Sequence, residues 1–112
     1  MLDRVSGALE RYLDLLSARQ KLVAQNIANA DTPGYRTKDL DFKSELANLM
    51  DSQWSPRTVQ AEGLSVRNDG NNVSLDREAR MLAENDIRFN FTVQLLRSRI
   101  RSLRSAIQEG RS

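Results

Sequence analysis

The chain has 112 residues, enough for one domain, or for less than one if it folds only within an assembly. Its 17 basic and 15 acidic residues give a net charge of +2, which by itself is no sign of nucleic-acid binding, although the pI is about 9.4. It has no Cys and no His, which excludes disulfides, thiolate zinc sites, cysteine nucleophiles and the commonest general base. We therefore expect no enzyme, and no cofactor, metal or small-molecule substrate.

The sequence shows no membrane or secretion signal. No apolar run approaches the roughly 20 residues that cross a bilayer. The first residues, MLDR, lack a basic segment followed by an apolar one. We expect no cleavable signal peptide.

The apolar pattern of residues 1–30 predicts a helix. Apolar side chains recur in alternating steps of four and three, with a single charged interruption at Arg19. The stripe consists of Val5, Leu9, Tyr12, Leu16, Val23, Ile27 and Ala30. Asp31-Thr32-Pro33-Gly34 must end this helix. Pro33 fixes φ at the second position of a type II turn, and Gly34 supplies the positive φ that the third position needs.

Residues 31–74 predict a turn, a short helix and a loop region. Phe42, Leu46 and Leu49 are spaced for a helix of about three turns, capped by Asp39 or Asp41. Residues 57–61 and 64–67 could form a small β-hairpin, and 68–72 a loop. We interpret Asp39, Asp41 and Glu45 as capping or solvated residues, because they lack the ligand ladder of a calcium loop. Trp54 could anchor a partner or cover the short helix, and both interpretations stay open.

Residues 75–110 predict a second long helix, capped by Ser74 or Asp76. A stripe in the same 4-3 spacing runs through Leu75, Ala79, Leu82, Asp86, Phe89, Val93, Leu96, Ile100, Leu103 and Ile107. A helix of about 34 residues is about 50 Å long, too long for a compact domain of this size. Part of its stripe therefore needs a partner outside the local fold.

These elements predict a mainly α fold within a single domain, residues 1–112. The long terminal helices pair as a coiled-coil-like hairpin, and a short helix with an irregular loop or small β-hairpin lies between them. Asp86 and Arg19 each interrupt an apolar stripe, so we expect them to contact one another. Arg97, Arg101 and Arg104 share one side of the second helix while Arg99 points away. This arrangement favours a solvated or subunit-facing surface over a nucleic-acid or lipid site.

Residues 25–36 read QNIANADTPGYR, which resembles the N-terminal motif of bacterial flagellar rod and hook proteins. KDLDFKSEL (38–46) and LLRSRIRSLRSAIQEG (95–110) resemble segments of the proximal rod proteins of the flagellar basal body, and among them the short B-type member. Residues 52–72 match only in being short and polar. The positions that carry the motif are Asn26, Ile27, Ala28, Asn29, Ala30, Thr32, Pro33, Gly34 and Tyr35.

The resemblance implies an axial subunit of the periplasmic rod, whose terminal helices pack with neighbouring subunits into a torque-transmitting helical tube. It implies export by the flagellar type III apparatus without a cleaved signal. The implied partners are copies of the chain, other proximal rod proteins, the rod–ring adaptor and the export-gate membrane proteins, with no nucleic acid. The expected subunit interface comprises Val5, Leu9, Tyr12, Leu16, Val23, Ile27, Phe89, Val93, Leu96, Ile100, Leu103 and Ile107.

The residues alone leave two alternative functions open. A helical-hairpin adaptor unrelated to flagella would fold as a stable monomer or small dimer. A basic nucleic-acid binder would bind in a salt-dependent manner through Arg97, Arg101 and Arg104. Neither alternative accounts for the motif of residues 25–36.

Overall fold

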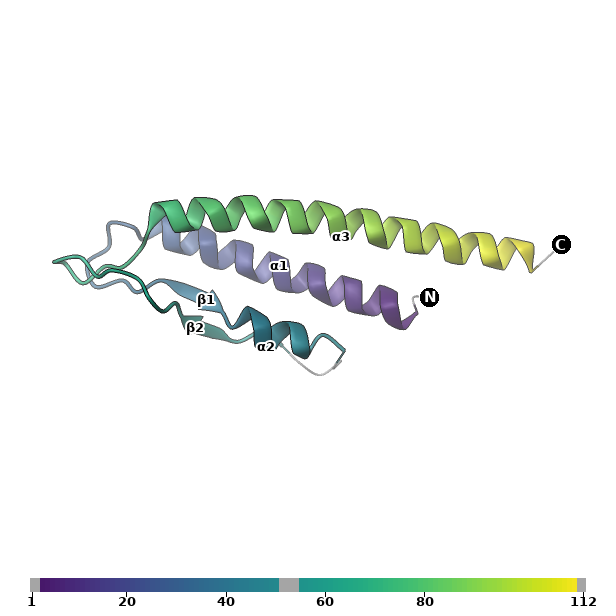
Figure 1. The fold of residues 1–112 in the computed structure, drawn as a ribbon, viewed down its shortest axis with the longest axis horizontal. Helices are drawn as coiled ribbons and strands as arrows, with labels where there is room; N and C mark the ends of the chain where they lie inside the picture. Colours follow the sequence, from purple (N-terminus) through teal and green to yellow (C-terminus); the bar gives the residue numbers. More distant parts are fainter. Residues whose placement is uncertain (1–2, 51–54, 111–112) are drawn as a thin grey trace.

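The computed structural model describes residues 3–50 and 55–110, which form an elongated body of 70 × 25 × 18 Å. Two long antiparallel helices, α1 (Arg4–Ala28) and α3 (Leu75–Glu109), lie side by side (Figure 1). The radius of gyration is 18.1 Å, against about 13 Å for a compact domain of 100 residues. The predicted mainly α hairpin is confirmed. Trp54 lies outside the described residues.

Capping residues set the starts of both long helices, and a Pro-Gly turn follows the end of α1. The Asp3 carboxylate accepts a hydrogen bond from the Ser6 N–H at 2.8 Å and caps α1. Ser74, one of the two predicted caps, accepts from the Arg77 N–H at 3.2 Å and caps α3. After α1, the Tyr35 N–H donates to the Thr32 carbonyl at 3.2 Å across Pro33 and Gly34. The φ of Gly34 is +77°, as the predicted type II turn requires.

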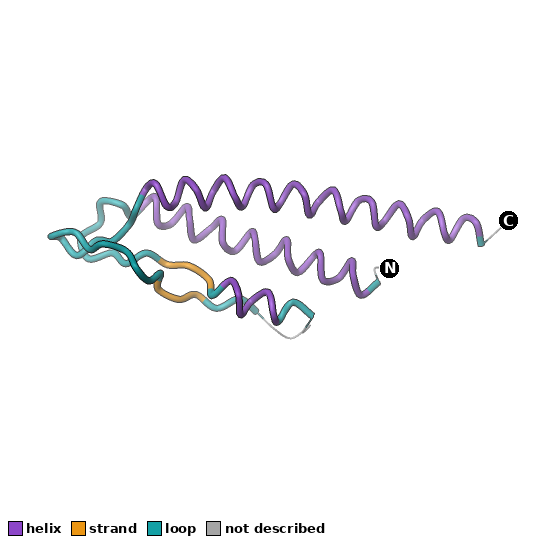
Figure 2. The backbone as a smooth tube through the Cα atoms, in the orientation of Figure 1, coloured by secondary structure: helices purple, strands orange, loops and turns teal. Residues whose placement is uncertain are grey.

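The segment between the helices forms an arm that packs along α1 (Figure 2). It consists of β1 (Lys38–Leu40), α2 (Phe42–Ala47) and β2 (Thr58–Gln60). The strands are antiparallel, with Asp39 opposite Val59. The core between the arm and α1 contains Leu15, Leu22 and Leu40, covered by Tyr12, Ala18, Phe42 and Leu49.

The predicted hairpin between residues 57–61 and 64–67 is wrong, because β2 pairs with β1 and residues 64–67 form no strand. Pairing with β1 places β2 beside Leu40, which is buried against α1. A separate hairpin of these two short segments would have had no apolar surface to pack against, and an isolated two-stranded hairpin is marginally stable in water.

The line of contact between α1 and α3 is polar on the α3 side. The buried residues of α3 are Glu78, Asn85 and Thr92, spaced seven apart. The Asn85 amide donates to the Leu16 carbonyl at 2.9 Å and to Gln20 Oε1 at 3.1 Å. The predicted apolar stripe of α3 therefore lies beside the contact line, and all of its members are half-buried or exposed.

Arg99 continues the seven-residue spacing of Glu78, Asn85 and Thr92 and forms an ion pair with Asp3. This pair joins the start of α1 to α3, and α3 then continues beyond the start of α1 (Figure 2). Hydrogen bonds from the Arg99 guanidinium and from Ser6 lower the pKa of Asp3 from 3.8 to about 2. Because the pKa is lowered in the folded chain, the pair contributes stability above pH 3.8, and this contribution is lost as the pH falls through about 2.

We expect Arg99→Gln to return the pKa of Asp3 toward 3.8, because it removes the charged donor. The measurement is an NMR titration of the Asp3 carboxyl carbon in the two proteins. Arg97→Gln, on the same helix, serves as the matched control. An Asp3 titration that is the same in all three proteins would show that the ion pair does not form in solution.

Candidate functional site

A buried polar cluster holds the turn end of the helix pair together. At its centre is Asn26 of α1, whose amide donates to Glu78 Oε1 of α3 at 2.7 Å and to the Lys38 carbonyl at 2.8 Å. The Asn26 carbonyl oxygen accepts from the Tyr35 hydroxyl at 2.9 Å and from the Lys38 N–H at 3.0 Å. One fully buried side chain thus links α1, the residue after the turn, β1 and α3. This accounts for the first Asn and the Tyr of the motif.

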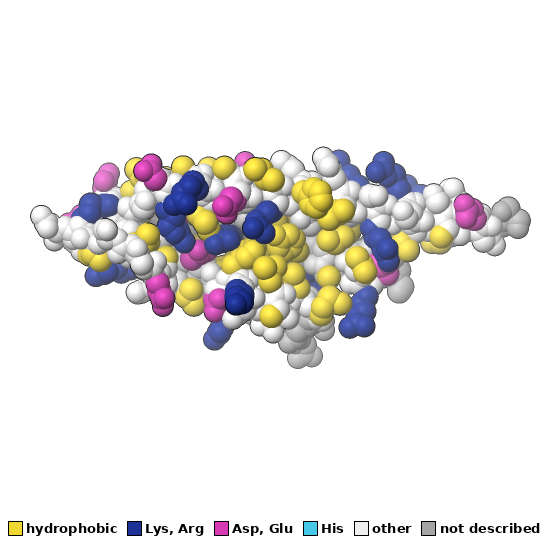
Figure 3. Space-filling model, viewed as in Figure 1, with side chains coloured by type: hydrophobic (Ala, Val, Ile, Leu, Met, Phe, Trp, Pro, Cys, Tyr) yellow, Lys and Arg dark blue, Asp and Glu magenta, His cyan; other side chains and the backbone are white. Residues whose placement is uncertain are grey.

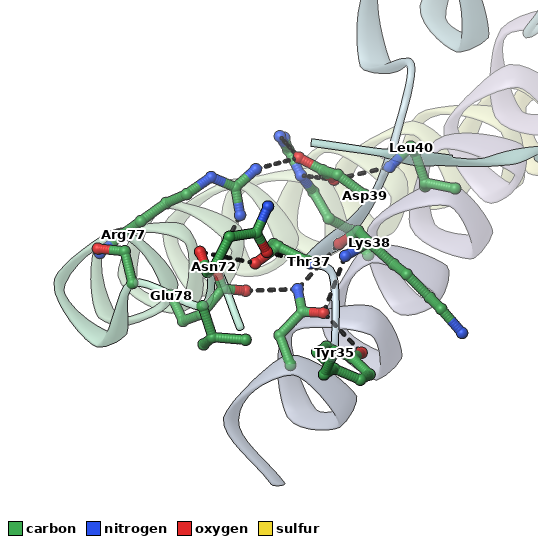
Figure 4. Close-up of polar contacts among 12 residues, drawn as sticks. Tyr35, Thr37, Lys38, Asp39, Leu40, Asn72, Arg77 and Glu78 are labelled. Atoms are coloured by element: carbon green, nitrogen blue, oxygen red, sulfur yellow. Dashed lines mark hydrogen bonds and ion pairs between the residues drawn. The ribbon is translucent and has the colours of Figure 1, made fainter. Parts of the chain in front are cut away.

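Charged residues extend the polar cluster toward the arm (Figure 4). Arg77 contacts Glu78 Oε2 and Asp39 Oδ2, each at 2.6 Å, and Arg19 reaches Asp39 Oδ2 at 3.1 Å. Burial lowers the pKa of Arg77, but the hydrogen bonds and charges of Glu78 and Asp39 outweigh it, so the pKa is raised. Burial also raises the pKa of Tyr35, with a smaller effect from the Glu78 charge. Both side chains stay in their hydrogen-bonding protonated form at neutral pH.

The predicted contact between Arg19 and Asp86 is wrong. Arg19 faces the arm, where it pairs with Asp39 and lies 4.4 Å from the centre of the Phe42 ring. Asp86 is exposed on α3. At 100° per residue, Arg19 lies about 60° around α1 from Leu16, which faces α3. The prediction assumed that the two residues that interrupt the stripes face one another, and it did not take this rotation into account.

The interpretation of Asp39 and Glu45 as capping or solvated residues is also wrong. Asp39 is buried in the polar cluster, and Glu45 is buried and accepts from the Arg57 N–H at 3.0 Å. Asp41 does precede α2, but its side chain makes no capping hydrogen bond. Asp39 thus holds the arm to the two long helices, and Glu45 joins two segments of the arm.

The loop of residues 67–73 closes over the turn. The Asn71 amide donates to the carbonyls of Asn29 at 2.9 Å and Thr32 at 2.8 Å, and the Gly34 N–H donates to the Asp69 carbonyl at 2.8 Å. A Cβ at Gly70 would lie 3.2 Å from the Gly34 Cα, so the two backbones need this glycine to approach. Sequence reasoning placed a loop here but did not find Asn71 or Glu78 as partners of the motif. The many Asn residues near position 70 were the available signal.

The expected interface residues divide by burial. Leu16 and Val23 are buried within the subunit, between the two helices. Val5, Ile27 and Ile107 are exposed. The others are half-buried: Leu9, Tyr12, Phe89, Val93, Leu96, Ile100 and Leu103. Ten of the twelve expected positions are therefore partly or fully exposed on the surface of the single subunit.

An apolar surface that sequence reasoning missed lies on the outer face of α3. We call Ile87, Phe91 and Leu95 the outer ridge, and their exposed fractions are 70%, 62% and 43%. The face shown in Figure 3 displays hydrophobic side chains along the middle of α3. The four-residue spacing of the outer ridge is visible in the sequence, but the prediction considered only the longer 4-3 stripe.

The described ranges, 3–50 and 55–110, contain no group of three or more acidic side chains that could hold a metal ion. Within the same ranges, no helix has the length and apolar character that spanning a membrane requires.

The fold and the turn together define a class of protein. Residues 13–36, which hold the second half of α1 and the turn, match the family model described as "Flagella basal body rod protein". The chain is also similar over 98% of its length to curated relatives, and it belongs to the family of flagellar basal-body rod proteins. It is a structural subunit of the flagellar rod.

The particular relatives are all called flagellar basal body rod protein FlgB. The protein of Yersinia enterocolitica is 34% identical, with 100% of its length covered. Those of Salmonella typhimurium and Escherichia coli K12 are 32% and 31% identical, each with 99% covered. These alignments span 137 positions, so at least 25 of them face gaps in the 112-residue chain.

We expect Asn26→Ala to destabilise the chain by about 1–3 kcal/mol, because it leaves buried partners without hydrogen bonds. The measurement is the urea unfolding midpoint by circular dichroism. Gln25→Ala removes an exposed neighbouring amide and is the matched control. If the two variants unfold at the same urea concentration, the polar cluster does not hold the turn end.

Proposed function

We propose that the chain is the B-type subunit of the proximal rod, built into the axial tube that transmits motor torque. The observation that supports this most is the match to FlgB proteins over 98% of the chain. The elongated helix pair, 70 Å in its longest dimension, agrees with a subunit of a long axial tube. The polar cluster would prevent the two helices from sliding past one another.

The exposed apolar surface supports assembly through α1 and α3. Val5, Ile27 and Ile107 are exposed, and Leu96 and Ile100 are half-buried. Burying such surface yields about 25 cal/mol per Å² removed from water. Neighbouring subunits in a tube would provide this burial, while Leu16 and Val23 would hold the subunit itself together.

We propose further that assembly completes the folding of the subunit. The polar cluster would order the turn end in the free chain. Past Arg99, α3 extends beyond the start of α1, so this segment has little of its own chain to pack against (Figure 1). Ordering a residue costs about 1–2 kcal/mol in backbone entropy, which docking into the rod would offset.

The proposed partners are copies of the chain, other proximal rod proteins, the rod–ring adaptor and the export-gate membrane proteins. The proposed location is the periplasmic rod, reached through the flagellar export apparatus without a cleaved signal. An incompletely folded free subunit would suit passage through an export channel.

Hydrogen exchange of the free chain tests coupled folding. We expect the amides of residues 100–109 to exchange on the order of tenfold faster, or more, than those of residues 20–28, because only the latter lie beside the polar cluster. In isolated basal bodies, both segments should be protected. Equal protection in the free chain would show that α3 folds fully without the rod.

We expect Leu96→Asp to abolish swimming in a strain that carries only this variant, because it places a charge on the apolar face used for assembly. The matched control is Asn90→Asp, which adds the same carboxylate at an exposed position of α3. Circular dichroism of both purified variants checks that helicity is kept. A motile Leu96→Asp strain would contradict the proposed assembly surface.

A further inference from the structure

An open groove runs between α1 and α3. It has a volume of about 370 Å³. Its walls are Leu16, Ser17, Gln20 and Lys21 from α1, and Asn85, Asp86 and Phe89 from α3. The floor is apolar at Leu16 and Phe89, while Lys21 and Asp86 are exposed. This volume is enough to hold large side chains from another helix.

Asn85 joins the two walls of this groove. The residue is 4% exposed, and its amide nitrogen already donates to Leu16 and Gln20. Its side-chain oxygen has no hydrogen-bond partner among the described residues. That oxygen is itself closed to solvent, so a neighbouring chain does not reach it. The two hydrogen bonds of the Asn85 amide instead hold the two walls of the groove together.

The outer ridge of Ile87, Phe91 and Leu95 faces away from this groove. At 100° per residue, the ridge lies on average about 240° around α3 from Asn85, whereas Asp86 and Phe89 lie about 70° from it. Groove and ridge are thus about 170° apart on the same helix. Each subunit therefore presents an apolar concave surface on one face and an apolar convex surface on the opposite one.

We propose that the outer ridge of one copy of this chain docks in the open groove of the next copy. The chemistry of the two surfaces is complementary. Glu84 beside the ridge and Lys21 at the groove are both exposed and carry opposite charges, so they can pair when the apolar ridge covers the apolar groove. An apolar contact alone would not need this charge match.

The geometry makes this contact heterologous, because the ridge and the groove are different surfaces. Such contacts repeat from copy to copy and generate rings or helices rather than closed two-fold dimers. The inference rests on the proposed function and deepens it, since it names the surfaces through which neighbouring copies contact one another in the tube.

Cross-linking in the assembled rod tests the contact, and a chain without Cys suits it. A strain lacking the wild-type chain is given Ser17→Cys/Gln94→Cys, and isolated basal bodies are treated with a short bismaleimide. We expect a ladder of dimers, trimers and larger species. A single Cys allows no more than a dimer, so Ser17→Cys and Gln94→Cys alone should show no ladder.

Ser17→Cys/Asn48→Cys is the matched control, because it joins the groove position to an exposed site on the arm. Basal bodies without a ladder, or equal ladders in both double variants, would overturn the inference and leave the proposed function standing. If the wild-type chain does not restore basal bodies in the same strain, the proposed function itself fails.

If the double-cysteine variant does not assemble, exchanging the charges of Lys21 and Glu84 tests the contact between the ridge and the groove. We expect Lys21→Glu and Glu84→Lys each to shrink the swimming halo, and the combined variant to restore it, because the pair then has its charges exchanged. A combined variant that swims no better than either single variant would overturn the inference.

Discussion

The four hydrogen bonds of the Asn26 side chain are the constraint on which the rest of the structure depends. They join α1 to the turn, to β1 and to Glu78 of α3, and the side chains of Asn26 and Glu78 are both fully buried. A buried amide loses about 1–3 kcal/mol for an unmade bond, so a shift of α3 along α1 is strongly disfavoured. The position of every later α3 residue relative to α1 follows from this point.

The polar contact line of α3 has a consequence for assembly. Because Glu78, Asn85 and Thr92 occupy the buried positions, the apolar side chains of α3 lie to the sides of the contact. They are only partly covered by the subunit and remain available to neighbours. A helix pair with an apolar centre would have been more stable alone and would have left less surface for a tube.

The arm plays a supporting role in this arrangement. Its ion pairs through Asp39 reach both Arg19 of α1 and Arg77 of α3. Leu40 and Phe42 cover one side of α1 and leave the opposite groove beside Leu16 open. One side of α1 is thus covered within the subunit, and the groove beside Leu16 stays open.

The sequence by itself determined the two long helices, the Pro33–Gly34 turn and the family, because helix periodicity, turn chemistry and a short motif are local properties. Only the tertiary structure decided that Arg19 meets Asp39, that β2 pairs with β1 and that Asn26 meets Glu78. These contacts depend on how each helix is rotated about its axis, and a stripe several residues wide does not fix that rotation. Buried hydrogen bonds do fix it, since few rotations satisfy them all.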